Sequence, residues 1–295
     1  MNKKVLTTTF GIFTLILACG YIFYIAVEHH KDFALIKFQV SFTTLVFPIA
    51  LSVLAGFINA YAWFKINKTH SSTKLITSYF AWSSSRLYRY IPGKIFGYYL
   101  RHKLQKTSPF HSIAASLNEF QSSLIPLSLI CAIYFSVERN DHIVSLFFLI
   151  TSVLIFIAKP ILLFLSNNTK KIKPIAESML NLKLLSETVG YAIFAIFFHG
   201  LAFYIMVSTV FFADNFSMIT AIFCLYVSAI IGQLSFISPA GLGVKEASMT
   251  AILVTQGFTA EVSLIIALSS RTLLVFSEVV NMLLALVLRN IIQDD

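Results

Sequence analysis

Charged side chains are scarce in this sequence. Asp, Glu, Lys and Arg make up only 12% of the residues, whereas 57% are hydrophobic and the mean hydropathy is +0.81. A soluble domain carries about 25% charged residues, so this composition excludes an ordinary water-soluble globule. It suits a bilayer instead, which a helix of roughly 20 consecutive apolar residues can cross.

Cysteines and catalytic signatures are also few. Cys19, Cys131 and Cys224 each lie inside an apolar run without the spacing of metal ligands, so we expect packing residues rather than disulfides. The sequence contains no H-E-x-x-H, G-x-S-x-G or P-loop motif, which argues against the common hydrolases. We therefore expect no cofactor and no metal, and we favour transport over catalysis.

Long apolar runs dominate the chain. They show none of the period-two alternation of a membrane barrel, so we predict an all-α fold. It would be a polytopic membrane helix bundle with about eight spans in one integral domain, residues 1–295. Two segments, 75–100 and 238–258, are too polar or too interrupted by proline and glycine for a simple span, and we expect Pro/Gly-broken or re-entrant helices there. The predicted spans are Leu6–Val27, Val40–Phe64, Ile113–Phe135, Ile143–Leu165, Thr188–Phe212, Ser217–Ile237 and Glu261–Leu288.

The basic residues favour one orientation. The formal net charge of +9 arises largely from cations in short loops, which is a topology signal rather than evidence for nucleic acid. We expect the N-terminus and these loops to lie in the cytoplasm, at an inner membrane. We also expect 238–258 to cross the bilayer, which makes the C-terminus cytoplasmic. The cations are Lys3, Lys4, Lys65, Lys68, Lys74, Lys170, Lys171, Lys173 and Lys183.

The segment 75–100 combines tyrosines and arginines with a helix break. Pro92 and Gly93 interrupt it, because proline lacks an N–H and glycine is permissive. Basic residues flank both ends, so we expect it to begin and end on the cytoplasmic side. One interpretation is an interfacial anchor, and the other is a mouth that binds an anionic headgroup. The candidate binding residues are Arg86, Arg89, Pro92, Gly93, Lys94 and Arg101.

The segment 238–258 ends one apolar helix and begins another. The new N-terminus would offer backbone N–H groups to an anion, although a loop at the membrane surface is the plainer alternative. Its Pro239 follows Pro92 by 147 residues, which hints at a duplication with halves near 1–147 and 148–295. The candidate binding residues are Pro239, Gly241, Gly243, Lys245 and Glu246.

The last predicted helix carries charges near its centre. Arg271 and Glu278 lie on the same face. An arginine there costs at least ~2.5 kcal/mol on insertion scales, so it needs a partner or water. We expect the partner to be Glu246 or Glu278, in either a structural ion pair or a substrate path. Weaker candidates for a polar path are Glu119, His199, Asn59 and Gln233.

Two stretches together resemble the lysylphosphatidylglycerol synthase transmembrane (flippase-like) family. Arg89-Tyr90-Ile91-Pro92-Gly93-Lys94, with the later Arg101, resembles its first motif. Pro239-Ala240-Gly241-Leu242-Gly243-Val244-Lys245-Glu246-Ala247 resembles its most recognisable motif, roughly P-x-G-x-G-x-[RK]-E. Arg271 falls where that family has an arginine in the following helix. Ala240 and the aromatic pair Tyr98-Tyr99 leave the substrate open.

The resemblance implies a function in lipid movement. Bifunctional members add an amino acid to phosphatidylglycerol with a soluble domain, and we expect no such domain after Asp295. The resulting hypothesis is a translocase for a phospholipid, glycolipid or polyprenyl-linked saccharide in envelope or surface polysaccharide biosynthesis. Its partners would be anionic or lipid-linked membrane lipids, and proteins of envelope synthesis. The alternatives are an intramembrane transferase, with Glu246 or Glu119 as general base, and a non-transporting scaffold.

Overall fold

The computed structural model describes residues 42–68, 73–90, 95–166, 181–211, 216–234 and 239–293, with Glu177 and Met179. These residues form helices and turns without any strand, which confirms the predicted all-α class. The predicted span Leu6–Val27, the cysteine Cys19 and the candidate site residues Pro92, Gly93 and Lys94 lie outside the described residues.

Four helices are long and apolar enough to cross a bilayer. A fifth crossing is formed by α7 and α8 if that pair, bent by 61°, is one span. The chain is therefore a multi-pass helical membrane protein, but about eight spans are not confirmed in the described residues. The four long helices are α3 (Phe42–Lys68), α6 (Pro109–Val137), α10 (Leu182–Val210) and α13 (Ala260–Gln293), and the bent pair is α7 (His142–Phe156) and α8 (Ala158–Ser166).

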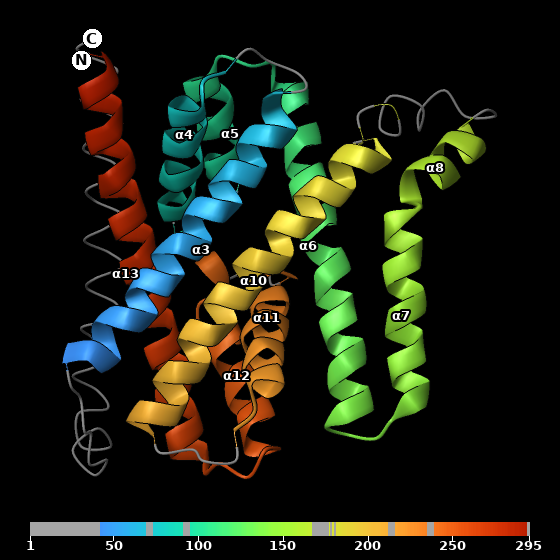
Figure 1. Cartoon of the computed structure of the whole chain (residues 1–295), viewed down its shortest axis with the longest axis vertical. Helices are drawn as coiled ribbons and strands as arrows, with labels where there is room; N and C mark the ends of the chain where they lie inside the picture. Colours follow the sequence, from blue (N-terminus) through green and yellow to red (C-terminus); the bar gives the residue numbers. More distant parts are fainter. Residues whose placement is uncertain are drawn as a thin grey trace.

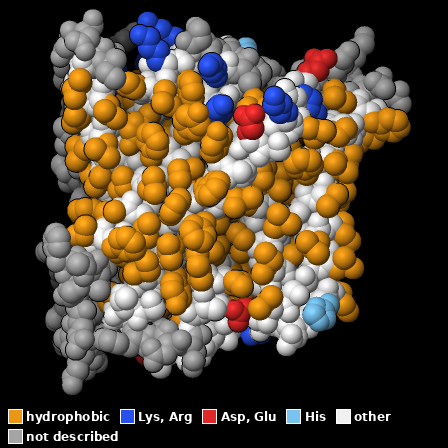
Figure 2. Space-filling view, viewed as in Figure 1, with side chains coloured by type: hydrophobic (Ala, Val, Ile, Leu, Met, Phe, Trp, Pro, Cys, Tyr) orange, Lys and Arg blue, Asp and Glu red, His pale blue; other side chains and the backbone are white. Residues whose placement is uncertain are grey.

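The surface of the bundle, like the length of its helices, suits a lipid environment. Apolar side chains cover the middle of the bundle in Figure 2, and Lys and Arg gather at one end in that view. Phe47, Phe147 and Phe194 are among many large apolar side chains that stay exposed. Exposed apolar area on this scale marks a surface that something other than water must cover. The bilayer serves that purpose for a helix bundle.

A short helical hairpin enters the bundle from one end. It consists of α4 (Leu75–Tyr88) and α5 (Ile95–Gln105), which lie side by side in the upper half of Figure 1. Both outer ends lie near the end of α3, because Gln105 hydrogen-bonds to Asn67 and also to the Ser78 hydroxyl at 3.2 Å. Fourteen residues of α4 rise only about 21 Å, less than the ~30 Å hydrocarbon core. The break between α4 and α5 falls within the predicted segment 75–100.

A second short hairpin enters from the opposite end. It consists of α11 (Met218–Leu234), the turn η1 (Pro239–Gly241) and α12 (Val244–Val254), in the lower half of Figure 1. Ser217 before α11 hydrogen-bonds to Glu138, and Gln256 after α12 donates to the Tyr134 hydroxyl at 2.7 Å. Both outer ends of the hairpin therefore lie at the C-terminal end of α6.

This arrangement differs from the predicted crossing of 238–258. Neither helix of the second hairpin spans the bundle, and α12 packs back against α11. The chain then leaves at the end where it entered, and α13 crosses the whole bundle afterwards (Figure 1). The end of α13 consequently lies at the same end as Lys65 and Lys68 of α3, the relationship expected for the C-terminus although by a different route.

The tips of the two hairpins meet in the middle of the bundle. Tyr90, at the tip of the first hairpin, packs in one apolar cluster with Ala240, at the tip of the second. Val275 and Val279 of α13 complete this cluster. The helix α13 also packs against both α4 and α12, so it forms a common support for the two tips.

Candidate functional site

Glu119 of α6 is the centre of a charged cluster that it forms with residues of the first hairpin. It pairs with Arg86 at 3.4 Å and with Arg101, whose side chain is only 6% exposed. Trp82 donates its indole N–H to the same carboxylate at 2.8 Å. Arg101 also donates to Ser85 at 2.7 Å. Two guanidinium groups and an indole thus surround one carboxylate, which leaves it well satisfied.

Aromatic rings complete this cluster. The Arg86 guanidinium lies 4.5 Å from the centre of the Trp82 ring, and that of Arg101 lies 4.3 Å from the centre of the Trp63 ring. Such cation–π contacts stabilise a cation that has lost part of its water. The indole groups have no conspicuous sequence signature, and sequence reasoning did not identify either tryptophan as part of a site.

Arg89 connects the tip of the first hairpin to α13. Its guanidinium lies 2.6 Å from Glu278, whose side chain is 8% exposed. Tyr90 donates its hydroxyl to the second oxygen of the same carboxylate at 3.3 Å. The tip is therefore held by an ion pair and a hydrogen bond to one residue of the supporting helix.

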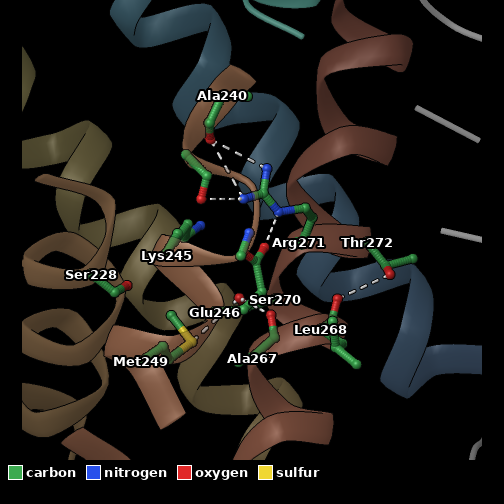
Figure 3. A network of polar contacts seen from close by, with 12 residues as sticks. Ser228, Ala240, Lys245, Glu246, Met249, Ala267, Leu268, Ser270, Arg271 and Thr272 are labelled. Atoms are coloured by element: carbon green, nitrogen blue, oxygen red, sulfur yellow. Dashed lines mark hydrogen bonds and ion pairs between the residues drawn. The ribbon is translucent and has the colours of Figure 1, made fainter. Parts of the chain in front are cut away.

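Arg271 connects the tip of the second hairpin to the same helix. Its Nε–H donates to Glu246, and both residues are almost fully buried, at 3% and 5% exposed. Figure 3 shows the guanidinium facing the carbonyl oxygen of Ala240, which lies 3.5 Å away. The carbonyl oxygen of Gly241 is also 3.5 Å from the guanidinium. Of the two partners expected for Arg271, the structure selects Glu246, whereas Glu278 pairs with Arg89.

The start of α12 is capped by the protein itself. Glu246 accepts a hydrogen bond from the Gly243 N–H at 2.8 Å, in addition to its contact with Arg271. A carboxylate is favoured at a helix start because it accepts hydrogen bonds from unpaired N–H groups there. Its negative charge also interacts favourably with the positive end of the helix dipole. The sequence predicted that these N–H groups would be open to an anion, but the Gly243 N–H is already occupied by Glu246.

A tight backbone contact shapes the turn before α12. Gly241 has φ +70°, and a Cβ there would lie 2.7 Å from the Cα of Gly232 on α11. Ala240 adopts φ 51°, a left-handed conformation that an L-residue rarely takes. The two glycines let α11 and the turn touch, which brings the carbonyl groups of 240 and 241 to Arg271.

Lys245 is the exceptional cation of this region. The residue is 6% exposed, yet its amine makes no hydrogen bond or ion pair within the described part of the chain. In Figure 3 the amine lies beside the Arg271 cluster without a contact drawn to it. It interacts electrostatically with Arg89 and with both Glu246 and Glu278, so it lies within range of both hairpin tips.

The weaker candidates have different environments. His199 of α10 hydrogen-bonds to the Tyr226 hydroxyl at 3.3 Å and interacts electrostatically with Arg86, Arg89 and Lys245. Asn59 is half-buried on α3, and Gln233 is exposed near the end of α11.

Two ion pairs on α13 and one network on α6 thus join six of the predicted site residues. Arg86, Arg89, Arg101, Glu246, Arg271 and Glu278 each have a charged partner. Glu119 was only a weak candidate because its partners lie 18 and 33 residues away in sequence, beyond any helical spacing. Among the described residues, no group of His, Cys, Asp and Glu could hold a metal ion.

No family model, curated protein or solved structure matches this chain.

Proposed function

We propose that this chain is a flippase-like translocase that moves a lipid with an anionic headgroup between membrane leaflets. The substrate would be a phospholipid, a glycolipid or a polyprenyl-linked saccharide of envelope or surface polysaccharide biosynthesis. The resemblance of the Pro239–Ala247 and Arg89–Lys94 stretches to the flippase-like family motivates this substrate class.

One observation carries the proposal: a cluster of paired charges lies where two broken hairpins meet inside an apolar bundle. Buried charges in a membrane are costly and usually mark a path for a polar substrate. Opposing broken helices at mid-membrane are the usual architecture of such a site in transporters. The headgroup would pass along the polar tips while the acyl chains stay in lipid.

The orientation follows from the positive-inside rule. We place the end of the bundle that holds Lys65 and Lys68 in the cytoplasm of the inner membrane. The first hairpin would then open toward the cytoplasmic leaflet, and the second toward the opposite leaflet. Arg86, Arg89 and Arg101 would receive the headgroup from the cytoplasmic side.

A transferase is less favoured by the same contacts. Glu119 and Glu246, its candidate bases, are both engaged in ion pairs with arginine, whereas a general base must lie within hydrogen-bond reach of the proton that it abstracts from the substrate. Proteins of envelope synthesis could bind either a translocase or a scaffold, so the functional test must measure lipid movement directly.

The test is leaflet exchange in proteoliposomes. Fluorescent phosphatidylglycerol or a labelled polyprenyl-phosphate sugar would be reconstituted with the purified protein, and the inner-leaflet label would be followed with an impermeant quencher. We expect exchange with the native protein and its loss with Glu246→Gln, which removes the charge opposite Arg271. Glu187→Gln is the matched control, because its contact with Lys65 at 3.7 Å is on the surface. Equal rates with and without protein, or a new lipid mass in place of exchange, would refute the translocase.

A further inference from the structure

A stripe of tyrosine and lysine side chains runs along the surface where α3 packs against α10. Tyr61 of α3 meets Tyr191 of α10 edge to face, with 5.1 Å between the ring centres. One turn further along α3, the Lys65 amine lies 3.7 Å from the carboxylate of Glu187, which is one turn back along α10. The two helices are therefore antiparallel here, and these two contacts define their register.

The next turn of the stripe holds two lysines without a carboxylate. Lys68 follows Lys65 by three residues, and Lys183 precedes Glu187 by four, so each lies on the face of its helix that makes the contact. Both lysines are exposed, and neither amine has a hydrogen bond or ion pair to a residue that the structure describes. Glu187 balances Lys65, so the excess positive charge lies at the outer end of the stripe.

The depth of these groups suits the headgroup layer of a bilayer. The Lys68 amine lies 5.8 Å from the centre of the Phe64 ring, so the side chain bends back toward the middle of the bundle. Tyrosine and lysine are typical of a membrane–water interface, because each has an apolar body and a polar end.

Apolar surface continues the stripe toward the middle of the bundle. Leu54 lies seven residues before Tyr61, and Phe194 lies three residues after Tyr191, so both are on the faces that carry the tyrosines. Both apolar side chains are exposed. Figure 2 shows this order on the surface, with cations gathered at one end of the bundle and apolar side chains below them. The stripe therefore changes from cationic through aromatic to apolar with depth.

An anionic phospholipid is the occupant that fits this order. Its phosphate would meet the unpaired amines, its glycerol and ester groups would lie beside the tyrosines, and its acyl chains would cover the apolar side chains. A zwitterionic lipid offers the same chains but no net charge to attract the lysines. An acidic protein would meet the lysines from water and would leave the aromatic and apolar parts of the stripe uncovered.

We propose that the outer end of this stripe, with Lys68 and Lys183, binds an anionic phospholipid of the leaflet at that end of the bundle. The lysines are exposed, whereas the ion pairs at the hairpin tips are buried. The bound lipid is therefore a resident of the lipid-facing surface and not the transported substrate, and the inference does not rest on the proposed translocase function.

The test counts the lipids that stay bound to the purified protein. The protein would be mixed with equal amounts of phosphatidylglycerol and phosphatidylcholine of identical acyl chains, and retained lipids would be counted by native mass spectrometry. We expect the native protein to prefer phosphatidylglycerol, and Lys68→Gln and Lys183→Gln each to reduce that preference about fivefold, the contribution of one lysine near an anionic surface. Equal retention of the two lipids by the native protein would overturn the proposal.

Lys103→Gln is the matched control. Lys103 is an exposed lysine near the end of α5, and the contact of Gln105 with Asn67 places that end of α5 beside the end of α3. The variant thus loses the same charge at the same end of the bundle but outside the stripe, and its preference should persist. An equal reduction would show that retention follows the total charge of this end, which would overturn the assignment to the stripe.

The double variant Lys68→Gln/Lys183→Gln locates the lipid. We expect it to retain the two lipids almost equally. A preference for phosphatidylglycerol as strong as that of the native protein would place the anionic lipid on another surface and would contradict the proposal.

Discussion

Arg271 and Glu278 lie seven residues apart on α13, and each holds the tip of a different hairpin through an ion pair of opposite polarity. Arg271 binds Glu246 of α12, whereas Glu278 binds Arg89 beyond α4. Because seven residues are two helical turns, both side chains lie on one face of α13. One helix therefore supports the two hairpins that enter from opposite ends of the bundle.

The Arg271–Glu246 pair should be strongly coupled. Glu246→Gln keeps an oxygen for the Gly243 N–H but leaves the Arg271 charge buried alone, and Arg271→Met does the reverse. Each single change should lower the free energy of unfolding by about 3–5 kcal/mol, whereas the double variant should recover much of that loss. The free energy of unfolding would be measured with increasing mole fractions of SDS for the native protein, the two single variants and the double variant. Additive losses would show that the pair is not coupled.

Removing the charge of Glu119 should also destabilise the protein. Glu119→Gln leaves Arg86 and Arg101 without their shared counter-charge, so we expect a loss of about 3 kcal/mol or more. The surface change Glu187→Gln should cost about 0–1 kcal/mol, because its ion pair with Lys65 is partly exposed to solvent. Thermal unfolding in detergent compares the two, and equal shifts would argue that the Glu119 cluster is not a buried network.

Substitutions at Ala240 and Gly241, in the turn before α12, should have opposite effects on stability. Gly241→Ala would bring a Cβ to 2.7 Å from Gly232 at a positive φ, so it should destabilise the protein and separate α11 from the turn. Ala240→Gly should instead stabilise it by about 1 kcal/mol, because glycine adopts the left-handed conformation of Ala240 without strain. The melting temperatures should therefore move in opposite directions, and a tolerated Gly241→Ala would exclude the close contact.

The re-entrant path of α11 and α12 predicts which loops share a side. Single cysteines would be placed at Lys74, Asn140, Ala260 and Asn290, all exposed, with the native cysteines replaced by alanine. An impermeant thiol reagent should label Asn140→Cys and Ala260→Cys from one side and the other two from the opposite side. Labelling of Ala260→Cys together with Lys74→Cys would mean that the second hairpin crosses the membrane.

The amino-acid sequence by itself determined the class of the protein. A charged fraction of 12% with long apolar runs leaves only a membrane helix bundle, because backbone groups in lipid must be satisfied within each helix. The same local reasoning located the helix breaks, since proline and glycine act on the residues next to them. It also identified Arg271 as a residue that needs a partner.

Only the tertiary structure decided which charges meet. The choice of Glu246 over Glu278 for Arg271, and the role of Glu119, depend on contacts between residues far apart in the chain. The sequence did not determine the path of residues 218–254 either. An apolar helix of 17 residues can cross a thin part of the bilayer or turn back within it. Packing of α12 against α11 and the hydrogen bonds at their outer ends settle that choice, since helical periodicity carries no information about a partner on another helix.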